Sequence, residues 1–194
     1  AIQMVETLVE INKSLESKKL PQLKIGIGLN TGEAVVGNMG ANVRFDYTAI
    51  GDTVNLAARL EGQTKNYGVT IVISKYTVDE LPQERVNSVD AERPFFVREL
   101  DFIRVKGKQE PVLIYHLYSR INDRARVKDM IDEYHNCLEI YRSKEFEKAK
   151  EKLNEFLETY KDDAPAMLYV ERCEEYLVNP PPEDWDYVYT ATSK

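Results

Sequence analysis

The sequence has few cysteines, no long apolar run and no glycine after residue 120. Its 2 cysteines, Cys137 and Cys173, are too few for a disulfide scaffold or a cysteine-rich zinc site, so we expect both to act as small buried apolar residues. No apolar run approaches the ~18–20 residues that a membrane span needs, and no signal peptide is recognisable. These absences predict a cytoplasmic chain without membrane contact, and they leave open a membrane anchor in upstream segments.

Charge and glycine are unevenly distributed along the 194 residues, which carry 33 acidic and 26 basic side chains for a formal net charge of −7. Residues 1–120 hold 15 side chains of each sign and all 9 glycines, whereas residues 121–194 hold 18 acidic and 11 basic ones. This shift predicts two parts, 1–120 and 121–194. The acidic balance argues against a nucleic-acid partner, because nucleic-acid phosphates repel acidic proteins.

Residues 1–120 combine helical and strand patterns. We expect helices over 2–19, 52–61 and 75–81, and strands over 23–30, 34–37, 45–50, 69–73, 95–100, 103–106 and 112–118. The first two strands are predicted to pair as a hairpin through the turn at 30–32. Gly26 and Gly28 alternate along the first strand, which lets another backbone or a ligand approach one of its faces. Hairpins among alternating elements favour an α+β mixed sheet over a doubly wound fold.

Residues 121–194 carry the spacing of three amphipathic helices. Their apolar stripes comprise Met130, Tyr134, Cys137, Leu138 and Tyr141; Phe146, Ala149, Leu153 and Phe156; and Met167, Leu168, Val170 and Leu177. A proline run at 180–182 ends the third helix, and 183–194, with Trp185, is predicted to be irregular or extended. Residues 141–149 resemble the middle of one tetratricopeptide-type helix pair, but about three repeats are needed for a solenoid. We expect a helical cap on its own domain or on a dimer mate; the alternative is a module for a protein partner.

The segment from Arg44 to Glu61 concentrates the candidate chemistry, because a helix begins there directly after a strand. Asp52 or Thr53 is predicted to cap the helix. Asn55 lies in the first turn, and Arg59 follows one turn later on the same face. Helix N-termini attract anions, and an arginine adds a planar fork that suits phosphate oxygens. The pattern therefore predicts a place that holds a phosphate or an anionic transition state.

Spacing alone also allows a purely structural use of these two side chains. Arg59 could pair with Glu33 or Glu61 on the surface, and Asn55 could support the helix cap. Both interpretations stay open at this point.

Five motifs together resemble the C-terminal half of a class III nucleotidyl cyclase catalytic domain. They are Ile-Gly-Ile-Gly at 25–28, Asn-Thr-Gly at 30–32, Gly-Asn-Met-Gly at 37–40, Tyr-Thr-Ala-Ile-Gly-Asp-Thr-Val-Asn-Leu-Ala-Ala-Arg-Leu-Glu at 47–61 and Val-Lys-Gly-Lys at 105–108. The resemblance covers about residues 1–120 and is greatest to bacterial and soluble-type adenylate cyclases. It implies a ferredoxin-like mixed sheet whose N-terminal strands are missing, followed by the small all-helical tail.

The resemblance also implies roles for individual residues. In this family the Asn matching Asn55 orients the ribose, and the Arg matching Arg59 stabilises charge on the α-phosphate during attack by the 3′-hydroxyl. The Lys matching Lys106 holds the β- and γ-phosphates, which leave as pyrophosphate. Thr48 occupies a base-selecting position, where a threonine resembles adenylate rather than guanylate cyclases. The substrate-binding positions implied in this way are Thr48, Ala49, Ile50 and Lys106.

ATP, two Mg²⁺ or Mn²⁺ ions and a head-to-tail homodimer follow from the same resemblance. The family's two metal-binding aspartates lie on strands upstream of residue 1, so no metal ligand is expected in this chain. We therefore interpret the chain as a fragment of an adenylate cyclase that is inactive by itself. The alternatives are a catalytically dead homologue that serves dimerisation or nucleotide sensing, and a guanylate cyclase.

Overall fold

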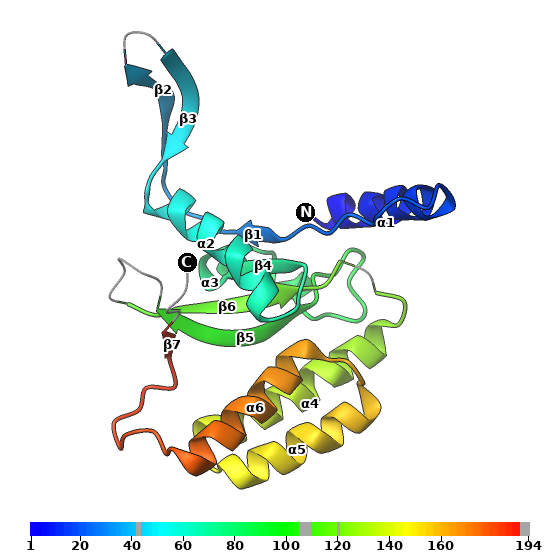
Figure 1. Cartoon of the computed structure of the whole chain (residues 1–194), viewed down its shortest axis with the longest axis vertical. Coiled ribbons are helices and arrows are strands. Elements are labelled where there is room, and N and C mark those ends of the chain that lie inside the picture. The colour runs from blue at the N-terminus through cyan, green and yellow to red at the C-terminus, as the bar shows by residue number, and fades with distance from the viewer. Residues whose placement is uncertain (42–43, 105–109, 120, 191–194) are drawn as a thin grey trace.

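A computed structural model describes residues 1–41, 44–104, 110–119 and 121–190 (Figure 1). The helices are α1 (Ile2–Ser17), α2 (Asp52–Asn66), α3 (Lys75–Asp79), α4 (Arg124–Arg142), α5 (Phe146–Thr159) and α6 (Ala164–Val178), with a 3₁₀ turn at Gln83–Arg85. The strands are β1 (Ile27–Leu29), β2 (Val35–Ala41), β3 (Arg44–Ile50), β4 (Ile71–Ser74), β5 (Val97–Arg104), β6 (Val112–Leu117) and β7 (Tyr189–Thr190). Within these ranges no helix is both long and apolar enough to cross a membrane.

Five strands form one mixed sheet in the order β1-β4-β6-β5-β7. The outer pairs β1–β4 and β5–β7 are parallel, and the inner pairs β4–β6 and β6–β5 are antiparallel. This arrangement confirms the predicted α+β fold with a mixed sheet. The two strands predicted at 95–100 and 103–106 are a single strand, β5, because a register shift between Glu99 and Asp101 lets one strand change direction without ending.

Strands β2 and β3 form a separate antiparallel ribbon that projects from the rest of the molecule (Figure 1). The predicted hairpin between 23–30 and 34–37 is therefore wrong, since β2 pairs with β3 while β1 pairs with β4. The physical reason lies at Asn30, whose side-chain amide donates to the carbonyl oxygen of Thr53 at 3.1 Å. This bond ties the end of β1 to helix α2, so the chain leaves the sheet instead of reversing beside β1.

Helix α2 lies directly against β1. A Cβ at Gly28 would be 2.2 Å from both the carbonyl oxygen of Ala57 and the amide nitrogen of Glu61. This contact confirms that the alternating glycines permit close approach, and the approaching backbone is that of α2. On the same face, Leu56 and Leu60 pack with apolar residues of β4, β5 and β6. Helices α1 and α3 contribute to a different cluster, which includes alternate residues of β4.

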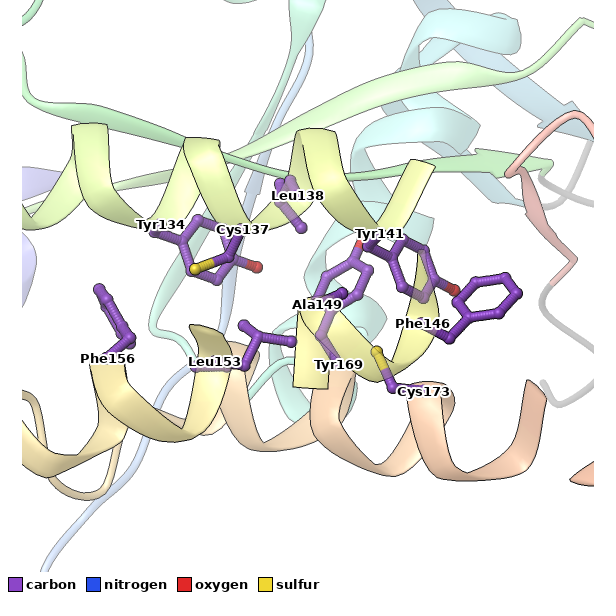
Figure 2. Close-up of a cluster of buried hydrophobic side chains, with 11 residues drawn as sticks. Tyr134, Cys137, Leu138, Tyr141, Phe146, Ala149, Leu153, Phe156, Tyr169 and Cys173 are labelled. Atoms are coloured by element: carbon purple, nitrogen blue, oxygen red, sulfur yellow. The ribbon is translucent and has the colours of Figure 1, made fainter. Parts of the chain in front are cut away.

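The last three helices pack together and lie against β5 (Figure 1). Figure 2 shows their shared core, to which each helix contributes apolar side chains. Its buried members include Tyr134, Cys137, Leu138 and Tyr141 of α4, Phe146, Ala149, Leu153 and Phe156 of α5, and Tyr169 and Cys173 of α6. Three helices and buried cysteines were both predicted. Of the two predicted places for the tail, its own domain or a dimer mate, the structure shows packing on its own domain. The likeness to a tetratricopeptide pair stays a prediction.

The chain after α6 returns to the sheet. Trp185 packs with ring-centroid distances of 5.4 Å to Tyr141, 5.7 Å to Phe146 and 5.2 Å to Tyr176. Beyond it, β7 adds to β5 in parallel register. In the segment after α6, which was predicted to be extended, Trp185 thus holds the chain against the helices of the tail.

Candidate active site

The candidate site lies where β3 passes into α2. The N-cap is Gly51, with φ 153° and ψ 162°, and no side chain caps the helix. The predicted cap at Asp52 or Thr53 is therefore wrong. The strand turns into the helix within one residue, and this turn needs a positive φ that glycine adopts without a Cβ penalty. Asp52 instead occupies the first helical position, where a carboxylate interacts favourably with the helix dipole.

Asn30 and Ser74 hold the first turn of α2 in place. The hydroxyl of Ser74 donates to Oδ1 of Asn30 at 2.6 Å, and Nδ2 of Asn30 donates to the Thr53 carbonyl oxygen at 3.1 Å. A Cβ at Gly32 would be 2.7 Å from Oγ1 of Thr53, so the turn after β1 lies close against the same residue. The sequence marked residues 30–32 only as a turn, and Ser74 was not singled out. The two bonding partners of Asn30, Thr53 and Ser74, lie 23 and 44 residues away in the sequence, beyond the reach of any local pattern.

Asn55 and Arg59 lie together on the solvent side of α2, as their spacing predicted. Both side chains are exposed, whereas Leu56 and Leu60 on the opposite side are fully buried. Among the residues that the structure describes, no ion pair links Arg59 to Glu61 or to any other acidic side chain, and Asn55 makes no capping bond. The guanidinium and the carboxamide are thus both presented to solvent at the start of the helix.

The last residues of β3 lead directly into this helix start. Thr48 pairs with Gly37, Ala49 with Val36 and Ile50 with Val35 across the ribbon. Thr48 and Ile50 are exposed and Ala49 is half-buried, so this end of the strand is accessible beside α2. Lys106 lies outside the described residues.

No cluster of three or more His, Cys, Asp or Glu side chains that could hold a metal ion occurs in the described ranges. The candidate side chains of β3 and α2 are an amide, a guanidinium and a hydroxyl, which suit an anionic, hydrogen-bonding ligand better than a divalent cation. The described residues therefore do not form a two-metal centre.

Comparison with known proteins assigns the family. Residues 1–119 match the model of the adenylate and guanylate cyclase catalytic domain. The chain is 31% identical over 180 residues to the terminal-differentiation specific adenylate cyclase of Dictyostelium discoideum, which covers 89% of this chain and 8% of that protein. It is 38% identical over 122 residues to an adenylate cyclase of Anabaena cylindrica, covering 60% of this chain and 23% of that protein. The chain belongs to the adenylate and guanylate cyclase catalytic domain family.

A solved structure agrees with this assignment. The adenylyl cyclase CyaB from P. aeruginosa matches with a TM-score of 0.50 and 31% identity over 63% of this chain and 57% of that one. The chain spans less than a quarter of the length of the two adenylate cyclases above. Because the Dictyostelium match covers 89% of the chain, it extends well beyond residue 119 into the helical tail.

Proposed function

We propose that this chain is part of an adenylate cyclase that converts ATP to cyclic AMP and pyrophosphate. In this proposal, residues 1–120 form the C-terminal part of the catalytic domain and residues 121–194 form a helical appendage. The observation that carries the proposal is the joint exposure of Asn55 and Arg59 at the start of α2, in a chain of the cyclase family. Both polar groups are available to a ligand and are held by a buried helix face.

The side chains act by positioning the nucleotide and by neutralising charge. Asn55 orients the ribose so that its 3′-oxygen faces the α-phosphorus. Arg59 donates to the α-phosphate oxygens, on which negative charge develops during attack, and a fixed guanidinium meets that charge without reorganisation. Lys106 holds the β- and γ-phosphates as the leaving group.

The base is assigned to the exposed end of β3. The hydroxyl of Thr48 can donate or accept a hydrogen bond and so suits an adenine edge, with Ala49 and Ile50 beside it. Two divalent ions would assist the reaction in the family's manner, and their ligands belong to residues outside the described ranges. The site residues that we assign include no metal ligand. We therefore propose that the chain by itself is inactive.

A homodimer partner completes the site in this proposal. The β2–β3 ribbon leaves Val35 66% exposed and Tyr47 76% exposed, and it leads to the proposed nucleotide-binding residues. Apolar side chains gathered on a projecting ribbon favour contact with another protein surface. The metal-bearing half of each composite site would then be contributed by the partner subunit.

The test is Arg59→Ala in the full-length protein, assayed with ATP and separately with GTP. We expect turnover of ATP to fall by at least about 10³-fold, because a transition-state arginine in phosphoryl transfer is worth on the order of 10³–10⁵. Lys65→Ala is the matched control, since Lys65 is an exposed cation on the same helix. It should leave turnover unchanged.

Both variants should unfold at the wild-type temperature, because neither side chain is buried. Undiminished activity in Arg59→Ala would contradict the proposed role of this residue. Turnover of GTP in place of ATP would make the protein a guanylate cyclase. A full-length protein that is inactive on both nucleotides would support the catalytically dead homologue.

A further inference from the structure

The far end of helix α2 is joined to the tail by a buried hydrogen-bond cluster. Tyr67, the C-cap residue of α2, donates its hydroxyl to Oδ2 of Asp101 at 2.7 Å. The same oxygen accepts from Nη1 of Arg172 at 2.6 Å, and Nη2 of Arg172 lies 3.5 Å from the tyrosine oxygen. One carboxylate of β5 thus connects α2 with α6.

All three side chains of this cluster are buried. Tyr67 is 1% exposed, Asp101 2% and Arg172 8%. Burial together with the Asp101 carboxylate raises the pKa of Tyr67 well above its ordinary value, so the hydroxyl keeps its proton and stays a donor. Buried polar groups bond in few geometries, because any departure leaves a charge unpaired in an apolar surrounding. The cluster therefore fixes the relative position of the two helices.

Packing at two further positions of α6 holds the same end of α2. Gly68, the residue after Tyr67, has φ +62° and lies close to α6. A Cβ added at Gly68 would be 2.5 Å from the Cβ of Ala164. Leu168 packs on the core cluster formed by α2 and the sheet. Ala164, Leu168 and Arg172 recur every four residues and so lie on one face of α6. That face is the one that contacts the end of α2.

The tail itself is anchored on β5 by contacts that do not involve α2. The Tyr169 hydroxyl donates to the carbonyl oxygen of Leu100 at 2.8 Å, and the buried Arg98 pairs with the partly buried Asp163 at 2.7 Å. On α4, Nε2 of His135 accepts the amide N–H of Glu99 at 3.1 Å. Helix α6 is thus fixed on the sheet and can act as a support for α2.

We propose that Tyr67 and Arg172 are positioning residues, through which the helical tail sets the placement of Asn55 and Arg59 on α2. This inference rests on the proposed function. Arg59 and Tyr67 are separated by about 12 Å along one continuous helix, at about 1.5 Å per residue. A rigid helix transmits a tilt at one end to the other, and a misplacement of about 1 Å can cost on the order of 10²-fold in rate. The Dictyostelium adenylate cyclase is similar to this chain across the catalytic part and most of the tail, which supports a joint function.

Two tyrosine variants test the inference with matched chemistry. Tyr67→Phe removes the hydroxyl that joins α2 to Asp101. Tyr169→Phe removes an equally buried hydroxyl that bonds to Leu100 instead, and it keeps the ring that lies 4.9 Å from the Arg172 guanidinium. In the full-length protein, we expect Tyr67→Phe to lower kcat about tenfold with little change in KM, because the catalytic groups are displaced rather than lost. Tyr169→Phe should keep kcat near that of the wild type, whatever its effect on the melting temperature.

Amide hydrogen exchange on this chain gives a readout that does not depend on activity. Exchange across 52–66 should be faster in Tyr67→Phe and unchanged in Tyr169→Phe, with both measured well below the melting temperature. Leu168→Ala, which removes apolar packing and no hydrogen bond, should accelerate exchange of α2 in the same way. It serves as the second variant if Tyr67→Phe does not fold.

Equal losses of kcat in Tyr67→Phe and Tyr169→Phe would overturn the inference, as would wild-type exchange of α2 in Tyr67→Phe and Leu168→Ala. Failure of the proposed function is distinguishable from these outcomes, because it would appear as full activity in Arg59→Ala or as a wild-type protein without turnover. In an inactive protein, α2 exchange still decides whether the tail fixes the helix.

Discussion

Gly28 lies so close to Ala57 that a methyl group added to the glycine would be 2.2 Å from the carbonyl oxygen of the alanine. The contact joins two backbones, those of β1 and α2, so no side-chain rotation can relieve it. Helix α2 carries the proposed catalytic residues and rests on this strand. Its height above the sheet is therefore set by the absence of a side chain at position 28.

Gly28→Ala should displace α2 and destabilise the chain by about 1–3 kcal/mol, the usual cost of overpacking a close contact. Gly62→Ala is the control on the same helix, since a Cβ there meets nothing within 4 Å. It should stabilise the chain by up to about 1 kcal/mol through helix propensity. Urea unfolding of the two variants and the wild type measures both changes. Equal stability of Gly28→Ala and wild type would show that α2 can move away freely.

The residues around α2 show which features the sequence could predict and which it could not. The spacing of Asn55 and Arg59 predicted correctly that they share one face of α2, and Leu56 and Leu60 lie on the opposite, buried side. Such periodic information is local, and helix spans could be predicted for the same reason. The partner of β2 could not be, because adjacent strands present equally apolar residues and only tertiary contacts choose between them.

Long-range polar pairs were also out of reach. Asp101 and Arg172 are 71 residues apart, and neither belongs to a motif that would mark it as buried. Each would be interpreted from sequence as a solvated charge, since Asp and Arg are almost never fully buried without a partner. The roles of Asn55, Arg59, Thr48 and Lys106 all remain predictions, because they rest on resemblance.

Asp163 caps the start of helix α6 and also pairs with Arg98 of the sheet, and these two functions can be separated. Oδ1 accepts the amide N–H of Ala166 at 3.0 Å as the N-cap of α6, and Oδ2 pairs with the buried Arg98 at 2.7 Å. Asp163→Ala removes both and should cost about 3–5 kcal/mol, because a buried guanidinium is left without its counter-charge.

Asp163→Asn should cost less than the alanine variant, because asparagine caps helices as well as aspartate does. Asp79→Ala is the control for an exposed pair, since Lys75 and Asp79 are each about half exposed. It should cost less than about 1 kcal/mol. Thermal unfolding at low and at moderate salt gives all three values. A cost in Asp163→Ala no larger than that in Asp79→Ala would contradict the buried pair.

Both cysteines should be unreactive in the folded chain. They are buried in the tail core, and burial raises the pKa of Cys137 to about 11 and that of Cys173 to about 12. Alkylation requires the thiolate, which is then scarce near neutral pH. Intact-mass measurement after iodoacetamide treatment should show no adduct in buffer and two in denaturant. Rapid labelling of the native protein would mean that the helices of the tail open readily.

His116 should make the chain lose stability in mild acid. It lies on β6 beside Arg98 of β5, with its Nδ1 atom buried, and its ring is tilted by 40° against that of Tyr118 at a centroid distance of 4.2 Å. Burial, with a further contribution from the Arg98 charge, lowers the pKa of His116 from 6.5 to about 3. The folded state therefore stays unprotonated in a pH range where the unfolded state takes up a proton.

The sign of the effect follows from this difference in pKa. The stabilisation is complete above the unfolded pKa of 6.5 and is lost as the pH falls toward the folded value of about 3. Between about pH 7.5 and pH 5, this one group should reduce the free energy of unfolding by about 2 kcal/mol. Burial also lowers the pKa of His135, which adds a loss of the same sign.

Urea unfolding of the wild type and of His116→Gln at several pH values separates the two contributions. Glutamine cannot titrate, so the decline of the variant between about pH 7.5 and pH 5 should be smaller than that of the wild type by about 2 kcal/mol. The remaining decline then belongs to His135 and to carboxylates that begin to protonate, and a second variant, His135→Gln, should reduce it further. Because glutamine offers an oxygen that can accept the Glu99 N–H, that second variant should fold at neutral pH. Parallel stability curves for wild type and His116→Gln would mean that the imidazole takes up its proton equally well in the folded and unfolded chains, so that its site does not lower its pKa.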